Sequence, residues 1–154
     1  MKPSEFLIQP RGPRHFDTWR WDQLVDTELG QLPLELYCEI GAQPTEAMVG
    51  RAGELAAFAR SQSAVLLDLI HGHYRYAEVN NWLEHWNVPG GLDRREVLGQ
   101  VESIILNVYE DLFASVHVNP LWDPEHKLNL AYDGAITEVN DSPFQLDAGV
   151  LIPQ

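Results

Sequence analysis

A β-hairpin pattern near the C-terminal end of the chain most constrains its fold. Apolar side chains alternate with more polar ones over Leu128–Tyr132, which is the period of a strand with one buried face. Asp133-Gly134 then fits the two positive-φ positions of a type I′ turn. A two-residue turn would place Leu130 opposite Thr137 and keep one face of the hairpin largely apolar. We therefore expect an antiparallel sheet in this part of the chain.

The pentapeptide Trp122-Asp123-Pro124-Glu125-His126 lies directly before this hairpin. Pro124 has no N–H donor, which argues against a central strand position. In an extended chain Asp123 and Glu125 would share a face, with His126 on the other. Such a set could bind a divalent metal or act as acid and base. A metal site needs three or four converging ligands, however, and no second motif at ligand spacing occurs.

Two other interpretations of the pentapeptide remain open. In a structural role, Trp122 would cover the core edge, Asp123 would accept hydrogen bonds from the turn at Pro124, and His126 would be partly buried. In a binding role, the pentapeptide would belong to an acidic surface that contacts a partner. The candidate partner-binding residues are Trp122, Asp123, Glu125, His126, Asp133 and Glu138.

Length and composition indicate one globular domain. The chain has 154 residues, of which 45% are hydrophobic and 21% charged. Cys38 is the only cysteine, so no disulfide can form within the chain, and its alternating surroundings predict a buried, inert thiol. The first residues lack a long apolar leader, and no stretch approaches the length of a membrane span. We expect a cytoplasmic protein.

The charge balance favours some partners over others. The chain carries 23 acidic and 10 basic residues, a net charge of −13, and Lys127 is the only base between Glu102 and Asp147. Such a surface repels nucleic acids and anionic membranes, because binding to either depends on attraction to negative charge. It would speed the encounter with a basic protein. The same charge could also serve solubility alone.

The expected fold is a single α+β domain over residues 1–154. N-terminal and C-terminal strands would form an antiparallel sheet against a central helical segment. Thr18–Val25 and Leu34–Ile40 read as strands, with Glu28-Leu29-Gly30 as the turn of a plausible hairpin. Residues 1–16 and 142–154 look irregular, although the apolar end of the second stretch could add an edge strand.

Helix signals fill the middle of the chain. Pro44-Thr45-Glu46 predicts a helix start capped by Thr45, with a break near residues 61–63. His71 and His73 would close this helical region near its negative end. Asn80–Trp86 predicts a short helix. Gly90-Gly91 lacks the spacing and the lysine of a phosphate loop, so no nucleotide or other cofactor is predicted.

Two strands should connect this region to the pentapeptide. Asp93–Glu96 has capping-box spacing and predicts a helix that runs to about Val101. Alternating apolar residues then predict a pair of antiparallel strands over 104–109 and 114–119, with His117 facing solvent.

The chain resembles an uncharacterised bacterial family of about this length. The matching residues are Pro44-Thr45, the segment Trp122-Asp123-Pro124-Glu125-His126-Lys127-Leu128-Asn129, and Asp133-Gly134 after it. Lys127 and Asn129 stand where the family tends to have glycine. Members are similar to immunity proteins of bacterial polymorphic-toxin systems. The resemblance implies a protein partner and brings no catalytic residues.

The leading hypothesis is therefore a binding protein that neutralises a cognate toxin by covering a basic surface. One alternative is a small metal-dependent hydrolase that uses Asp123, Glu125 and His126, with His71 or His73 brought close by folding. Another is a structural subunit that assembles with itself through a sheet edge or its tail. The sequence leaves the oligomeric state open.

Overall fold

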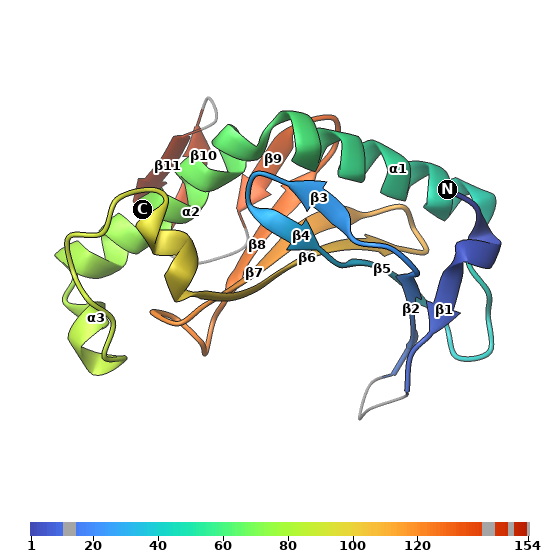
Figure 1. The fold of residues 1–154 in the computed structure, drawn as a ribbon, viewed down its shortest axis with the longest axis horizontal. Helices are drawn as coiled ribbons and strands as arrows, with labels where there is room; N and C mark the ends of the chain where they lie inside the picture. The colour runs from blue at the N-terminus through green and yellow to red at the C-terminus, as the bar shows by residue number, and fades with distance from the viewer. Residues whose placement is uncertain (11–14, 140–143, 148–149, 154) are drawn as a thin grey trace.

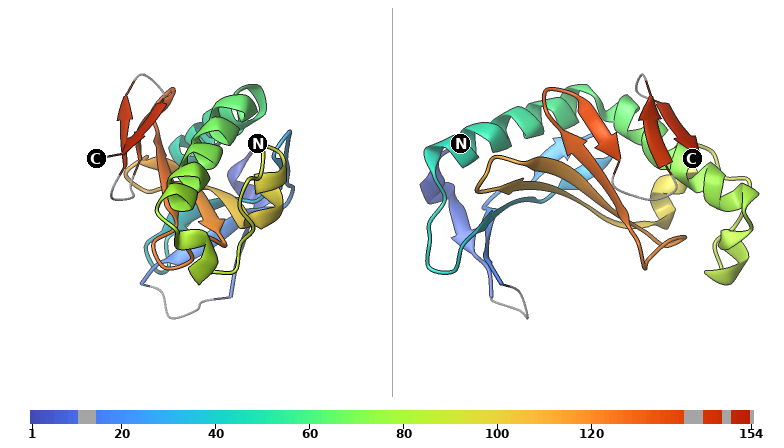
Figure 2. Two further views of the ribbon diagram at one scale, coloured as in Figure 1. Left: turned by 90° about the vertical axis from the view of Figure 1, so that its left-hand side faces the viewer. Right: turned by 180° about the vertical axis from the view of Figure 1, so that it is seen from behind.

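The computed structural model describes residues 1–10, 15–139, 144–147 and 150–153 of the chain. Its centre is a strongly curved seven-stranded sheet, and the helices α1 (Glu46–Ser61) and α2 (Ser63–Val79) arch over one face of it (Figure 1; Figure 2). Strands from both ends of the chain meet in this sheet. The predicted single α+β domain is therefore confirmed.

The remaining elements are short. The strands are β1 (Phe6–Ile8), β2 (Asp17–Trp21), β3 (Val25–Thr27), β4 (Gly30–Leu32), β5 (Leu34–Cys38), β6 (Val101–Tyr109), β7 (Ala114–Pro120), β8 (Leu128–Tyr132), β9 (Ile136–Val139), β10 (Phe144–Asp147) and β11 (Val150–Pro153). The other helical elements are the 3₁₀ turns η1 (Pro3–Glu5) and η2 (Glu96–Gln100) and the helix α3 (Trp82–His85).

The strand order of the main sheet is β1-β2-β5-β6-β7-β8-β9. Neighbours are antiparallel except β5 and β6, which run parallel and join the N-terminal strands to the C-terminal ones. Every residue of β5 is buried, so both of its faces are covered. Polar contacts across strands accommodate its second face, since Arg20 pairs with Glu35 at 3.5 Å and the Tyr37 hydroxyl donates to Asn107 Oδ1 at 3.0 Å.

The core lies between the sheet and the two long helices. Its largest fully buried side chains come from both layers: Leu34, Leu36, Leu106, Leu128 and Leu130 from the strands, and Met48, Leu55, Leu66, Leu69 and Ile70 from the helices. In the part of the chain that the structure describes, no helix has both the length and the apolar character needed to cross a membrane.

The predicted C-terminal hairpin is present as β8–β9, but its turn differs from the prediction. Asp133–Ala135 forms a three-residue loop in which Gly134 alone has a positive φ, of 76°. A type I′ turn would need two such residues, so that prediction is wrong. Leu130 lies opposite Val139 instead of Thr137. A slip of two residues preserves the face of each side chain, which is why the apolar face survives the error.

The helical segment follows its start and break signals. The Thr45 hydroxyl accepts the backbone N–H of Met48 at 3.2 Å and caps α1, as predicted. The break at residues 61–63 is also confirmed, because α1 ends at Ser61 and α2 begins at Ser63. The predicted position of His71 and His73 at a helix end is wrong. Helix α2 continues to Val79 because its buried face extends beyond both histidines.

Both ends of the chain are more regular than predicted. The N-terminal residues form η1 and the edge strand β1, which docks against β2 through the buried Phe6. Residues 28–30 turn a small β3–β4 hairpin and do not connect β2 to β5 directly. At the other end, β10 and β11 pair with each other beside α2 and add no strand to the main sheet (Figure 2). The other residues of 142–154 lie outside the described ranges.

The connection into the second half of the sheet keeps its predicted cap. Asp93 Oδ1 accepts the N–H groups of Arg95 and Glu96, and Glu96 Oε1 accepts the N–H of Asp93 at 3.1 Å. This is the reciprocal capping box, but it closes the turn at residues 93–96 that leads into the short η2, and no α-helix follows. The predicted antiparallel strands follow as β6 and β7, with His117 half-buried on the face opposite the valines.

Candidate functional site

The turn between β6 and β7 presents apolar side chains to solvent beside carboxylates. Leu112 is 39% exposed and Phe113 is 42% exposed. The turn is held tightly, because Tyr109 N–H donates to the Phe113 carbonyl at 2.9 Å and Asp111 Oδ1 accepts the Phe113 N–H at 3.0 Å. Leu112 adopts a left-handed φ of 68°, which is unfavourable for a branched side chain. A strained residue at an exposed apolar turn points to a role outside the core.

An aromatic hollow of about 400 Å³ lies on one side of this turn. Four rings form a continuous series: Phe16 and Tyr37 are 4.9 Å apart, Tyr37 and Tyr109 are 4.9 Å apart, and Tyr109 and Phe113 are 5.8 Å apart. Its other lining residues are His15, Cys38, Glu39, Glu110 and Asp111. The hollow therefore combines aromatic walls with carboxylates.

Electrostatics around the aromatic hollow are negative. Glu110 Oε1 accepts the N–H of Glu39 at 2.5 Å, which ties the end of β5 to the β6–β7 turn. Burial raises the pKa of the Cys38 thiol to about 11, and the nearby carboxylates of Glu110 and Asp17 act in the same direction. Cys38 is thus a buried, neutral thiol at physiological pH, as the sequence predicted.

An acidic groove of about 640 Å³ lies on the other side of the turn. Arg51 of α1 crosses it and donates to the Leu112 carbonyl at 3.2 Å and to Asp133 Oδ1 at 3.0 Å. Burial works to lower the pKa of the Arg51 guanidinium, but its hydrogen bonds to Asp133 and Glu54 outweigh burial and raise that pKa. The groove also contains Asp111 and Glu138, so the single guanidinium leaves it acidic.

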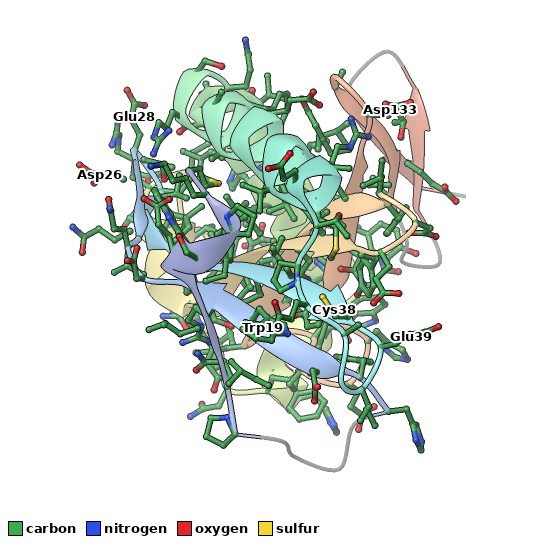
Figure 3. The ribbon with its side chains drawn as sticks, turned by 90° about the vertical axis from the view of Figure 1, so that its right-hand side faces the viewer. Trp19, Asp26, Glu28, Cys38, Glu39 and Asp133 are labelled. Atoms are coloured by element: carbon green, nitrogen blue, oxygen red, sulfur yellow. The ribbon has the colours of Figure 1, made fainter. Side chains whose placement is uncertain are left out.

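We call the exposed residues around the aromatic hollow and the acidic groove the turn surface. It consists of Glu39, Glu110, Asp111, Leu112, Phe113, Asp133 and Glu138. Figure 3 shows Cys38 and Glu39 together at the end of β5, with Asp133 farther up the view and Asp26 and Glu28 on the opposite side. Acidic residues therefore lie on two opposite sides of this view, and charge alone does not single out one of them. The β6–β7 turn differs because exposed apolar side chains lie there beside carboxylates.

The predicted residue Trp122 lies in the interior, not on a surface. Its side chain is 0% exposed, and its indole Nε1–H donates to His73 Nδ1 at 2.7 Å. The Tyr74 ring packs edge-on against it at 5.4 Å. The structural interpretation of Trp122 is thus confirmed, and it is more central to the core than predicted.

Asp123 is also buried and organises the turn that follows it. Its Oδ1 is 2.9 Å from His126 Nδ1 and accepts the His126 backbone N–H at 3.4 Å, while its carbonyl accepts the N–H of Lys127 at 3.0 Å. Its Oδ2 lies 3.8 Å from Nε2 of the buried His73. The predicted structural role of Asp123 is confirmed. The predicted burial of His126 is wrong, because its side chain is 68% exposed.

The six predicted binding residues therefore divide into three groups. Trp122 and Asp123 are interior and offer no surface to a partner in this conformation. Asp133 and Glu138 belong to the turn surface. Glu125 and His126 are exposed at the opposite end of β8, about 15 Å away along a five-residue strand.

Sequence reasoning missed the apolar part of the turn surface. The signal was present: Leu112-Phe113 interrupts two strands where polar turn residues are expected. The neighbouring carboxylate of Glu39 could not have been added, because only folding brings the end of β5 beside this turn.

The hydrolase hypothesis required His71 or His73 to lie close to the pentapeptide. His73 does so, because His73 and His126 both lie near Asp123. Within the described ranges, however, no three His, Cys, Asp or Glu side chains are grouped so that they could hold a metal ion. His73 Nδ1 is already engaged by Trp122 inside the core. The contacts present here fix the pentapeptide in place.

Comparisons with known proteins do not add a family. No family model matches the chain, and no curated protein or solved structure matches it significantly. Function is therefore argued from the site itself.

Proposed function

We propose that this chain is a binding protein that covers a basic surface of a protein partner, as an immunity protein does for its toxin. The observation that carries the proposal is the turn surface, where the exposed Leu112 and Phe113 lie between the aromatic hollow and the acidic groove. Large apolar side chains ringed by polar groups are the usual anatomy of a protein-binding patch.

The two components of the turn surface would contribute differently. Phe113 and Leu112 would supply affinity, because aromatic and apolar anchors at the centre of an interface account for most binding energy. The carboxylates would speed the encounter with a basic partner and exclude acidic ones. An enzyme that acts on an anionic substrate carries such a basic cleft, and covering the cleft would block the substrate.

The backbone at Lys127 is compatible with the glycine of the family pattern that the sequence resembles. Lys127 adopts a left-handed φ of 64°, a conformation that favours glycine. This is one of the two positions where the family pattern has glycine. The other, Asn129, lies within β8, where its Oδ1 is 2.7 Å from His117 Nδ1. A glycine at the first position would therefore fit the backbone there.

The test is the affinity of the chain for the proteins encoded by its neighbouring genes. We expect one basic product to bind with a Kd below about 1 μM. Phe113→Ala should weaken that binding by about 30-fold, the effect of losing one central anchor. Leu121→Ala is the matched control, because Leu121 is similarly exposed but lies outside the turn surface. Affinity weaker than about micromolar for every product would contradict the proposal.

One observation supports self-assembly as a second candidate function. Leu7 and Ile8 are exposed on β1, which is an edge strand of the main sheet. An exposed apolar edge can pair with another strand. Sedimentation at several concentrations should then show a dimer that Leu7→Lys dissolves, whereas a concentration-independent monomer excludes this candidate.

A further inference from the structure

We infer that the pocket between α2 and residues 91–95 binds a small zwitterionic ligand, an amino acid or a short peptide, through Arg95 and Glu28. The pocket has a volume of about 660 Å³ and shares none of its described lining residues with the turn surface. Figure 2 shows the β10–β11 hairpin on one side of α2 and the segment that contains η2 on the other side, where this pocket lies. The inference goes beyond the proposed function and does not depend on it.

One face of α2 forms the first wall of the pocket. Its lining residues follow one another at intervals of three or four positions, which places them on the same side of the helix: Ala64, Leu67, His71, Arg75 and Glu78. Glu28 reaches the pocket from the turn of the β3–β4 hairpin. The pocket therefore combines a helix face with a charged group from a separate element.

Residues 91–95 form the second wall and are held along α2. The Tyr74 hydroxyl accepts the N–H of Leu92 at 3.1 Å, and Arg94 Nη2 donates to the carbonyl of Ala64 at 3.3 Å. Position 92 is thus bonded to position 74 and position 94 to position 64, so this segment runs back along the helix. A wall that is already fixed spares a ligand the entropy cost of ordering it.

Most of the charged groups in the pocket already have partners. Arg94 Nε binds Asp68 Oδ1 at 2.8 Å, and Arg75 Nε lies 3.4 Å from Glu78 Oε1. Asp93 Oδ1 accepts two backbone N–H groups of the turn that it caps, which offset its charge. These contacts balance two guanidiniums and two carboxylates of the lining.

Arg95 and Glu28 are the charged residues of the described lining that remain. Both are exposed, and within the described part of the chain neither side chain takes part in a hydrogen bond or an ion pair. A ligand carboxylate can accept two parallel hydrogen bonds from the Arg95 guanidinium, and a ligand ammonium can donate to the Glu28 carboxylate. One free cation and one free anion in the same pocket therefore fit a ligand that carries both charges.

Ligands with a single charge fit this pocket less well. An inorganic anion would bind Arg95 but would be repelled by Glu28, and a simple amine would meet the converse. The volume of the pocket lies in the range of small-molecule sites and accommodates an amino acid or a peptide of about two or three residues. The buried Leu67 and the partly buried Leu92 line the same pocket and favour an apolar side chain on that ligand.

The experiment titrates the whole chain with leucine, leucyl-leucine and two capped forms of leucyl-leucine while backbone amide signals are followed by NMR. We expect saturable shifts of the amides of residues 64–78 and 91–95. The N-acetylated peptide lacks the ammonium and the C-amidated peptide lacks the carboxylate, so each should bind about 10-fold more weakly than the free peptide. Leucine that binds at least as tightly as leucyl-leucine would identify an amino acid site, and tighter binding of leucyl-leucine would identify a peptide site.

Matched variants assign the two charges. Arg95→Gln should weaken binding of leucyl-leucine about 10-fold but leave binding of the C-amidated peptide unchanged, because that peptide has no carboxylate for Arg95 to bind. Glu28→Gln should likewise weaken binding of leucyl-leucine but not of the N-acetylated peptide. Arg60→Gln and Glu84→Gln remove exposed charges outside the pocket and should not change the affinity.

Both pocket variants should keep the denaturation midpoint of the native chain, since neither side chain makes a polar contact within the described residues. The inference would be overturned by the absence of saturable shifts with leucine and leucyl-leucine, or by equal binding of the free and capped peptides. It would also be overturned if the variants weakened the capped peptides as much as the free one, or if the shifts were scattered over the molecule.

Discussion

Lys127 has a backbone conformation that is unfavourable for any residue other than glycine. Its φ of 64° costs a non-glycine residue about 1–2 kcal/mol, part of which glycine would lose again through greater freedom in the unfolded chain. We expect Lys127→Gly to raise the free energy of unfolding by about 0.5–1 kcal/mol, measured by urea denaturation. Lys127→Ala keeps the strain and should bring no gain. A lower free energy of unfolding in Lys127→Gly would show that the lysine side chain stabilises the fold by more than its left-handed backbone costs.

Asp123 and Glu125 are two neighbouring acids with different expected roles. Asp123 is buried and accepts from His126, so Asp123→Ala should lower the free energy of unfolding by about 1–2 kcal/mol by removing the charged acceptor that holds the turn after it. Glu125 is exposed, and Glu125→Ala should change it by less than about 0.5 kcal/mol. Chemical denaturation of both variants is the measurement. Similar losses in the two would assign Glu125 a structural role as well.

Residue roles were predictable where the cause was local. The neighbouring Pro124 predicted that Asp123 accepts hydrogen bonds in a turn, and the strand pattern around Cys38 predicted that its thiol is buried. The partner of Trp122 did not follow, because His73 is 49 positions away in the sequence. Hydrogen bonds between neighbouring residues could be predicted from the sequence, and contacts between residues far apart in the sequence could not.

The capping box at Asp93, in the turn that leads into η2, gives this turn a pH-dependent stability. The backbone N–H groups of Glu96 and Arg95 hold the pKa of Asp93 below its usual value of 3.8. A carboxyl with a lowered pKa stabilises the fold above its unfolded pKa, and this contribution is lost as the pH falls through the folded pKa. We expect the denaturation midpoint of Asp93→Ala to lie below that of the native chain at neutral pH. The difference should shrink below about pH 4. A difference that stays constant with pH would assign the cap to hydrogen bonding without charge.

Element identity was easier to predict than element geometry. The alternating residues of β8 and the cap at Thr45 define a strand and a helix through local patterns. The β8–β9 register depends on a bulge between Ala131 and Tyr132, which shifts the pairing without changing the hydrophobic pattern. The residues past His73 were misassigned because glycine and histidine in α2 resemble an ending, whereas packing of Tyr74 and Ala77 carries the helix on.

At the scale of the whole molecule, the position of a charge should matter more than the total. Glu138→Lys and Glu125→Lys change the net charge equally, but only Glu138 lies on the turn surface. We expect Glu138→Lys to slow association with a basic partner and to flatten its salt dependence, with a smaller effect for Glu125→Lys. Stopped-flow association rates at several salt concentrations would measure both. Equal changes in the association rate would indicate steering by total charge. A larger change in Glu125→Lys would place the partner's binding site near the pentapeptide.

The overall architecture could be predicted, while the assembled surface could not. Strand and helix order indicated the α+β class, because each element has its own periodicity. The turn surface gains Glu39 only because β5 and β6 pair in parallel and bring Glu39 next to Glu110. No local pattern announces such a pairing.

That parallel pairing also sets when the chain can fold during synthesis. The side chains of Tyr37 and Asn107 are bonded across the β5–β6 junction although 70 positions separate them in the sequence. Closing so long a loop costs entropy before any contact repays it, and proteins dominated by distant contacts fold slowly. A nascent chain that has emerged only through α3 holds β5 and both long helices but has no β6 against which to complete the sheet. β6 must therefore leave the ribosome before the turn surface, and with it the proposed binding site, can form.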